Sequence, residues 1–64
     1  MRVNRIKLIA LMAEKEINTI ELANSSGLAR ATISAVRGGK TCTFDTALKI
    51  SKALNVTVTD LIEE

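Results

Sequence analysis

The stretch from residue 19 to residue 39, TIELANSSGLARATISAVRGG, decides the fold. Asn18 lies directly before it and Glu21 follows three residues later, a capping-box pattern that predicts a helix beginning after Asn18. This helix should end at Gly27, because glycine readily takes the left-handed conformation. A second helix is expected over residues 30–37, where apolar residues three apart mark one face and a glycine pair follows. The stretch therefore predicts two short helices joined by a tight turn.

The flanking segments predict three further helices. Residues 3–15 are rich in good helix formers. Thr43 can cap a fourth helix that should end at Asn55, since asparagine tolerates the left-handed conformation. Residues 57–60 repeat the capping-box spacing and open a last short helix. With 64 residues, no proline and one aromatic, Phe44, we expect a single all-α domain of five helices around an aliphatic core.

The composition excludes several kinds of site. Histidine is absent and Cys42 is the only cysteine, so we expect no disulfide scaffold, metal or cofactor. Without a neighbouring base, Cys42 is interpreted as a half-buried filler. Arg2, Arg5 and Lys7 precede the apolar residues 8–13, but that run is too short for a signal peptide or a membrane span. We expect a cytoplasmic protein that is not an enzyme, associates with no membrane and takes no small-molecule ligand.

The charges are unevenly distributed. The net charge is only +2, from nine basic and seven acidic residues. No acidic residue lies between Glu21 and Asp45, whereas Arg30, Arg37 and Lys40 lie there. This basic segment indicates a face that meets a polyanion, although an ordinary solvated face would give the same pattern.

The two central helices have the spacing of a helix-turn-helix. Ala23 is small where the helices must cross, and Ile33 and Val36 can hold the second helix to the first. From Ile17 to Leu61 the chain resembles the Cro and phage-repressor family. The residues that carry the resemblance are Leu22-Ala23, Gly27-Leu28, Arg30, Thr32-Ile33-Ser34, Gly39-Lys40, Thr43-Phe44-Asp45-Thr46, Leu48-Lys49-Ile50, Lys52-Ala53-Leu54, Val56 and Asp60-Leu61-Ile62. The resemblance implies a compact five-helix lambda-repressor-like domain, residues 1–64, that binds double-stranded DNA and usually represses transcription from palindromic operators as a dimer.

The resemblance also implies a role for individual residues. The second helix would enter the major groove with its N-terminal residues on base edges. Arg30 is the candidate for a bidentate contact with guanine, and Thr32 and Ser34 can donate to base or phosphate. Ala31 and Ala35 either pack on thymine methyl groups or are merely permissive. The full set of expected DNA contacts is Asn18, Thr19, Arg30, Ala31, Thr32, Ser34, Ala35, Arg37 and Lys40. Two of these have simpler interpretations: Thr19 as an ordinary helix-start residue and Arg30 as a solvated one.

Two positions depart from the pattern of the family. Many relatives pair an acidic residue at the position of Arg37 with an arginine at the position of Met12. Here both partners are replaced, so we expect an apolar contact at Met12, no group left unpaired, and an Arg37 free for phosphate. Ala29 stands at the cap of the second helix, where serine or threonine is usual, at an expected cost of about 1 kcal/mol. Without glutamine or asparagine on this helix, specificity depends on Arg30, Ser34 and DNA shape, or the domain discriminates loosely.

Two apolar surfaces compete as interfaces. Val58 and Ile62 are one turn apart on the last expected helix, and with Leu61 pointing inward they form the expected homodimer interface. The first helix has two apolar faces, which are Leu8, Leu11 and Met12 and, nearly opposite, Ile6, Ile9 and Ala13. Either this helix is more buried than usual, or its second face meets a protein, as in an antitoxin or regulatory partner of the same fold.

Overall fold

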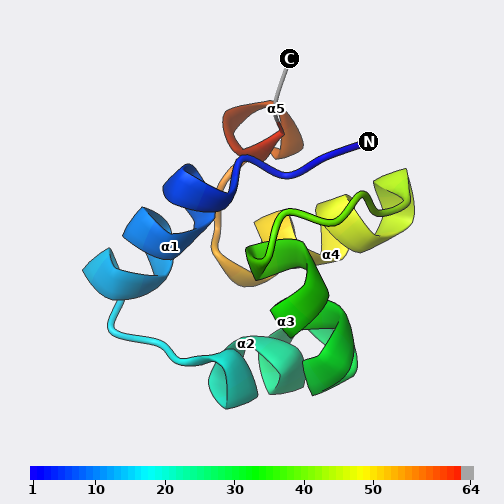
Figure 1. Ribbon diagram of the computed structural model, residues 1–64. Helices are drawn as coiled ribbons and strands as arrows, with labels where there is room; N and C mark the ends of the chain where they lie inside the picture. Colours follow the sequence, from blue (N-terminus) through cyan, green and yellow to red (C-terminus); the bar gives the residue numbers. More distant parts are fainter. Residues whose placement is uncertain (63–64) are drawn as a thin grey trace.

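The computed structural model describes residues 1–62, which form five helices and no extended sheet (Figure 1). The helices are α1 (Arg5–Glu14), α2 (Thr19–Ser26), α3 (Arg30–Arg37), α4 (Phe44–Ala53) and α5 (Val58–Leu61). The all-α expectation is therefore confirmed. The first helix begins two residues later than expected, because Asn4 is extended and its side chain accepts a hydrogen bond from the N–H of Lys7.

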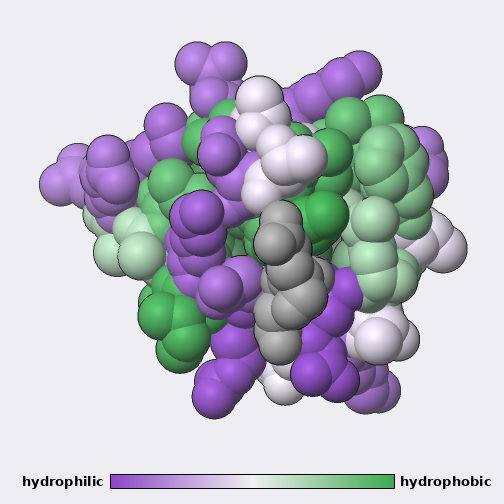
Figure 2. Space-filling view, turned by 90° about the horizontal axis from the view of Figure 1, so that it is seen from above, coloured by the Kyte–Doolittle hydropathy of each residue, from purple (hydrophilic) through white to green (hydrophobic). Residues whose placement is uncertain are grey.

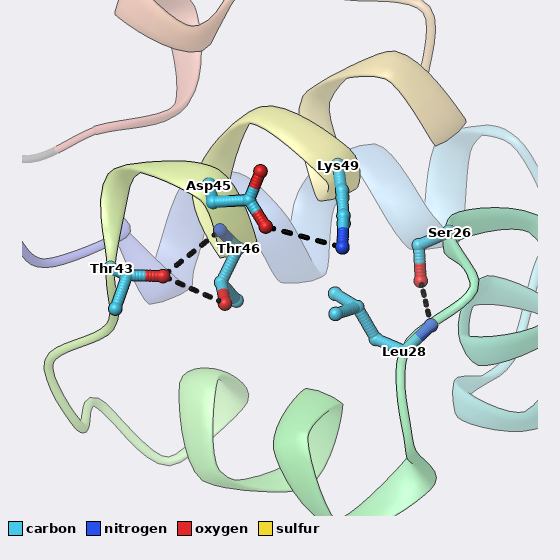
Figure 3. Close-up of polar contacts among 6 residues, drawn as sticks. All are labelled: Ser26, Leu28, Thr43, Asp45, Thr46 and Lys49. Atoms are coloured by element: carbon cyan, nitrogen blue, oxygen red, sulfur yellow. Dashed lines mark hydrogen bonds and ion pairs between the residues drawn. The ribbon is translucent and has the colours of Figure 1, made fainter.

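The expected helix boundaries follow from local capping. Asn18 and Glu21 form the reciprocal capping box of α2, and Gly27 ends that helix with φ 74°. The Thr43 hydroxyl accepts a hydrogen bond from the N–H of Thr46 at 3.2 Å and starts α4 (Figure 3). After α4, Asn55 takes the expected left-handed conformation with φ 57°.

The core is aliphatic, as the composition indicates. It is built from Val3, Leu8, Met12, Leu22, Ala23, Ile33, Val36, Ala47, Ile50, Leu54 and Leu61, each at most 5% exposed. Helix α2 contacts both α3 and α4, and α1 contacts α3. Each helix thus contributes to one cluster, and the arrangement fixes α2 and α3 relative to the rest of the domain.

The segment before α1 pairs with the residues at the end of α5. The N–H of Asn4 donates to the carbonyl oxygen of Leu61 at 2.8 Å, and Val3 forms an isolated antiparallel bridge with Ile62. The segment before α1 therefore lies beside α5 (Figure 1). The expectation that Ile62 continues the last helix is wrong: its ψ of 150° is extended, because it pairs with Val3.

Helix α1 buries only one of its two apolar faces. Leu8 and Met12 are buried, whereas Ile6 is 65% exposed, Ile9 is 37% exposed and Ala13 is exposed as well. The interpretation that α1 is more buried than usual is therefore wrong. Figure 2 views the molecule from the α5 side and shows hydrophobic surface between hydrophilic groups on that side of the domain.

Candidate functional site

The turn between α2 and α3 is fixed by its own hydrogen bonds. The N–H groups of Gly27 and Leu28 both donate to the carbonyl oxygen of Ala23, at 2.9 Å and 3.2 Å. The Ser26 hydroxyl accepts from the N–H of Leu28 at 3.3 Å (Figure 3). The same hydroxyl donates to the Ala23 carbonyl oxygen. The left-handed Gly27 allows this reversal. The turn sets the angle at which α3 leaves α2.

Helix α3 separates its side chains into an inner and an outer face. Ile33 and Val36 are 0% and 1% exposed and pack into the core. Arg30, Ala31 and Ser34 are exposed. Thr32 and Ala35 lie half-buried between the two faces. The predicted base-contacting residues therefore share one accessible surface, which begins at the first turn of α3.

The N-terminus of α2 lies close to the C-terminus of α3. The Arg37 Nη1 atom donates a hydrogen bond to Thr19 Oγ1 at 3.1 Å. The capping box uses the side chain of Asn18, which accepts from the N–H of Glu21 at 2.8 Å. Three of the residues predicted to contact DNA, Asn18, Thr19 and Arg37, are thus brought together at one end of the two helices.

The structure corrects the expectation for Arg37. Its side chain is half-buried and held by Thr19, so it is not a free arm. Its Nε–H is buried and has no partner among the described residues. The expectation that nothing is left unpaired after the loss of the family's ion pair is therefore wrong. Met12, at the other half of that pair, is 5% exposed and packs in the core as expected.

The loop after α3 carries Lys40, whose side chain is exposed. Gly39 has φ 95°, and the N–H of Lys40 returns to the carbonyl oxygen of Ala35 at 3.0 Å. Arg2 and Arg5 lie at this loop and line a cavity of about 240 Å³ together with Gly39. The sequence does not reveal that these two arginines lie beside the loop after α3, because they are more than 30 positions away from Gly39 along the chain.

The N-terminal arginines reach the loop through backbone pairing. The Met1 ammonium group donates to the carbonyl oxygen of Cys42 at 3.0 Å, and the Cys42 N–H donates back to Met1 at 2.7 Å. Cys42 is half-buried, as expected for a filler. The only signal in the sequence is the basic cluster Arg2, Arg5 and Lys7, a pattern that bears on signal peptides and membrane spans and does not indicate contact with this loop.

Among residues 1–62, no group of His, Cys, Asp or Glu could hold a metal ion. Within the same part of the chain, no helix is long and apolar enough to cross a bilayer. One carboxyl is perturbed: the Thr57 hydroxyl donates to Asp60 at 2.8 Å and, with the Thr57 N–H, lowers the pKa of Asp60 below its usual 3.8. This contact caps α5 and lies apart from α2 and α3.

Comparison with known proteins identifies the type of domain. A family model described as the Cro/C1-type HTH DNA-binding domain matches residues 7–63. The restriction-modification controller protein C.AhdI from Aeromonas hydrophila has a similar structure, with a TM-score of 0.81 and 26% identity over 88% of this chain and 86% of that protein.

A second similar structure supports the fold alone, and the curated proteins give no match. PhpD, solved with cadmium and also with hydroethylphosphonate, has a TM-score of 0.84 and 20% identity. The match covers 100% of this chain but only 14% of PhpD, so it shows the fold alone. No curated protein matches the sequence.

Proposed function

The chain belongs to the family of Cro/C1-type helix-turn-helix DNA-binding domains and is a DNA-binding transcription regulator, and we propose that it represses transcription by binding a palindromic operator as a dimer. Its 64 residues act as one cytoplasmic domain that needs no cofactor or small-molecule ligand and performs no catalysis. The observation that carries the proposal is the division of α3 into a buried face that anchors it and an exposed face free to enter a groove.

The exposed face of α3 supplies the proposed base contacts. Arg30 stands at the first turn, where its guanidinium can bond both acceptors of a guanine. Ser34 follows one turn later on the same exposed surface and can donate to a base or a phosphate. Ala31, Ala35 and Thr32 complete the surface that faces the groove. Few of these side chains can form specific hydrogen bonds, so DNA shape contributes to the choice of site.

The proposed contacts to the DNA backbone come from the start of α2 and from the end of α3 with the loop that follows it. The N-terminus of α2 brings Asn18 and Thr19 to one phosphate position, with the positive end of the helix dipole behind them. Arg37 adds charge beside them, and Lys40 lies exposed in the loop after α3. Such contacts fix the register of the domain on the duplex without reading sequence.

The proposed dimer uses the surface around α5. Val58 and Ile62 are half-buried and pack against the core with their inner atoms. A two-fold interface there would set two recognition helices about 34 Å apart, the spacing of successive major grooves on one side of the duplex. Because Ile62 also pairs with Val3, Val58 is the cleaner residue to change. Val58→Glu should abolish cooperative binding to a palindrome while leaving the affinity for one half-site nearly unchanged. Wild-type cooperativity in that variant would refute the interface.

A salt series with random duplex DNA tests the function. A phosphate-driven binder loses affinity steeply as salt rises, with log K falling by roughly 0.9 per phosphate contact for each decade of salt. Only charged groups release counterions, so we expect the salt slope of each domain to come from Arg37 and Lys40. Absence of binding at low salt would contradict the proposal.

A second candidate function rests on the exposed face of α1. Ile6 is 65% exposed and Ile9 is 37% exposed, with Ala13 one turn further along the helix. Such a face suits a protein partner, and the domain would then act as an antitoxin or regulatory subunit. Ile6→Glu distinguishes the two functions: it should leave DNA binding unchanged if DNA is the target. A pure protein-interaction domain would show no salt-dependent DNA binding with or without this change.

A further inference from the structure

The bond between Arg37 and Thr19 joins two residues that are 18 positions apart in the sequence but lie together at one end of α2 and α3. Thr19 is the first residue of α2 and Arg37 is the last residue of α3. The bond is therefore a direct link between the helix end that faces the DNA backbone and the helix that faces the bases.

This bond fixes the direction in which the Thr19 hydroxyl can donate. A threonine hydroxyl has one proton and two acceptor sites, and it rotates to suit its partners. Because Arg37 has donors and no acceptor, the Thr19 oxygen must accept from it, and the hydroxyl proton must point away from the guanidinium. Among residues 1–62 the Thr19 hydroxyl donates to no protein acceptor. The proton is thus available to a ligand that carries acceptor oxygens.

The guanidinium is held in place at an energetic cost. The Nε–H of Arg37 is buried without a partner among the described residues, and burying an unsatisfied donor is unfavourable. A side chain inserted in this way is not mobile in the manner of an exposed lysine. Its position next to the positive end of α2 adds charge where charge already repels it, which suits an anion site better than a purely stabilising contact.

We propose that Arg37 is a positioning residue for DNA binding: it orients the Thr19 hydroxyl as a donor to a backbone phosphate and acts through Thr19 rather than as an independent clamp. The inference rests on the proposed function. In this arrangement the Thr19 hydroxyl makes the phosphate contact and the Arg37 guanidinium sets its direction, so the two groups act as one unit. Lys40, exposed in the next loop, acts independently of this unit.

A double-mutant cycle on duplex binding tests the coupling. Arg37→Met removes the donor and its charge, and Thr19→Val removes the hydroxyl with little change in shape. Each single change should weaken binding by about three- to tenfold, the range of one hydrogen bond. The double variant should be no weaker than the weaker single variant, because residues that act through one another are not additive. If the two losses multiply, Arg37 contacts DNA independently and the inference is wrong.

Two controls make the cycle specific. Lys40→Met removes a charge of the same sign from the neighbouring loop, and its loss should multiply with that of Thr19→Val. Thr19→Ser keeps the hydroxyl and should retain wild-type binding together with full sensitivity to Arg37→Met. Thermal melts of the free variants identify any change that only unfolds the domain. If the wild-type protein binds no duplex at any salt concentration, the proposed function itself fails, an outcome distinct from multiplicative losses in a protein that binds.

Discussion

The missing cap of α3 gives a prediction about stability. Ala29 is the only residue directly before a helix of eight or more residues in the described chain that cannot offer a side-chain acceptor. Its backbone already has the extended conformation of a capping residue, φ −69° and ψ 148°. Its side chain is exposed, so a serine hydroxyl can be accommodated without repacking. Ala29→Ser should therefore supply an acceptor to the first turn of α3 without moving the backbone.

The size of the gain follows from the other caps in the chain. The Asn4, Asn18 and Thr43 side chains each accept from the N–H three residues later, at 2.8–3.2 Å. In α3 the corresponding N–H, that of Thr32, instead bonds the Ala29 carbonyl oxygen at 3.0 Å. Since this N–H is partly satisfied already, the gain lies at the lower end of the usual range, at about 0.5–1 kcal/mol. For a domain of this size, that raises the melting temperature by roughly 2–8 °C.

Ala31→Ser is the matched control. It makes the same chemical change on the same exposed face of α3, two residues later and inside the helix, where serine cannot cap and is slightly unfavourable. Calorimetric melts of the free protein should place Ala29→Ser above wild type and Ala31→Ser at or below it. Equal melting temperatures for the two variants would refute the reasoning about the cap.

Three further outcomes are expected. Arg30→Ala should cost roughly 1–3 kcal/mol on the best site and relax the preference at one base pair, whereas Lys40→Ala should weaken all duplexes equally and lower the salt slope by roughly one; equal loss on specific and random DNA for Arg30→Ala would contradict its role. Gly27→Ala should lower the free energy of unfolding by about 1–2 kcal/mol, because φ 74° is strained for alanine although no atom lies within 4 Å of the new Cβ; denaturant titration measures this, and an unchanged midpoint would contradict it. The lowered pKa of Asp60 means that its contact with Thr57 stabilises the fold at pH values above the unfolded pKa near 3.8, and that this stabilisation is lost as the pH falls through the lower pKa of the folded state. Asp60→Asn should therefore show a shallower acid transition in thermal melts across roughly pH 2–5. An acid transition identical to that of the wild type would exclude this contact as a cause.

The local features of the fold could be predicted from the sequence because each depends on neighbouring residues. Asn18 and Glu21 encode the start of α2, Gly27 encodes its end, and Asn55 encodes the left-handed residue after α4. The division of α3 into two faces follows from the spacing of Ile33 and Val36 together with the polar residues between them. These signals fix the position of the helix-turn-helix without any long-range information.

The features that were missed are contacts between distant parts of the chain. The spacing of Ile62 from Val58 predicts a helical Ile62, but backbone pairing with Val3 determines its conformation. The replacement of its usual partner predicts a free Arg37, yet the geometry of the turn brings Thr19 within reach. Spacing along one helix contains no information about either contact.

The central claim is that this domain recognises operator DNA as a dimer through the exposed face of α3. Selection of bound duplexes from a random pool by the wild-type protein tests it most directly. The account predicts enrichment of two inverted half-sites whose centres lie about one helical turn, roughly 34 Å, apart. It also predicts that Arg30→Ala removes the preference at one position of each half-site. A pool that shows no enriched half-site after repeated rounds, or one that Arg30→Ala leaves unchanged, would contradict the claim.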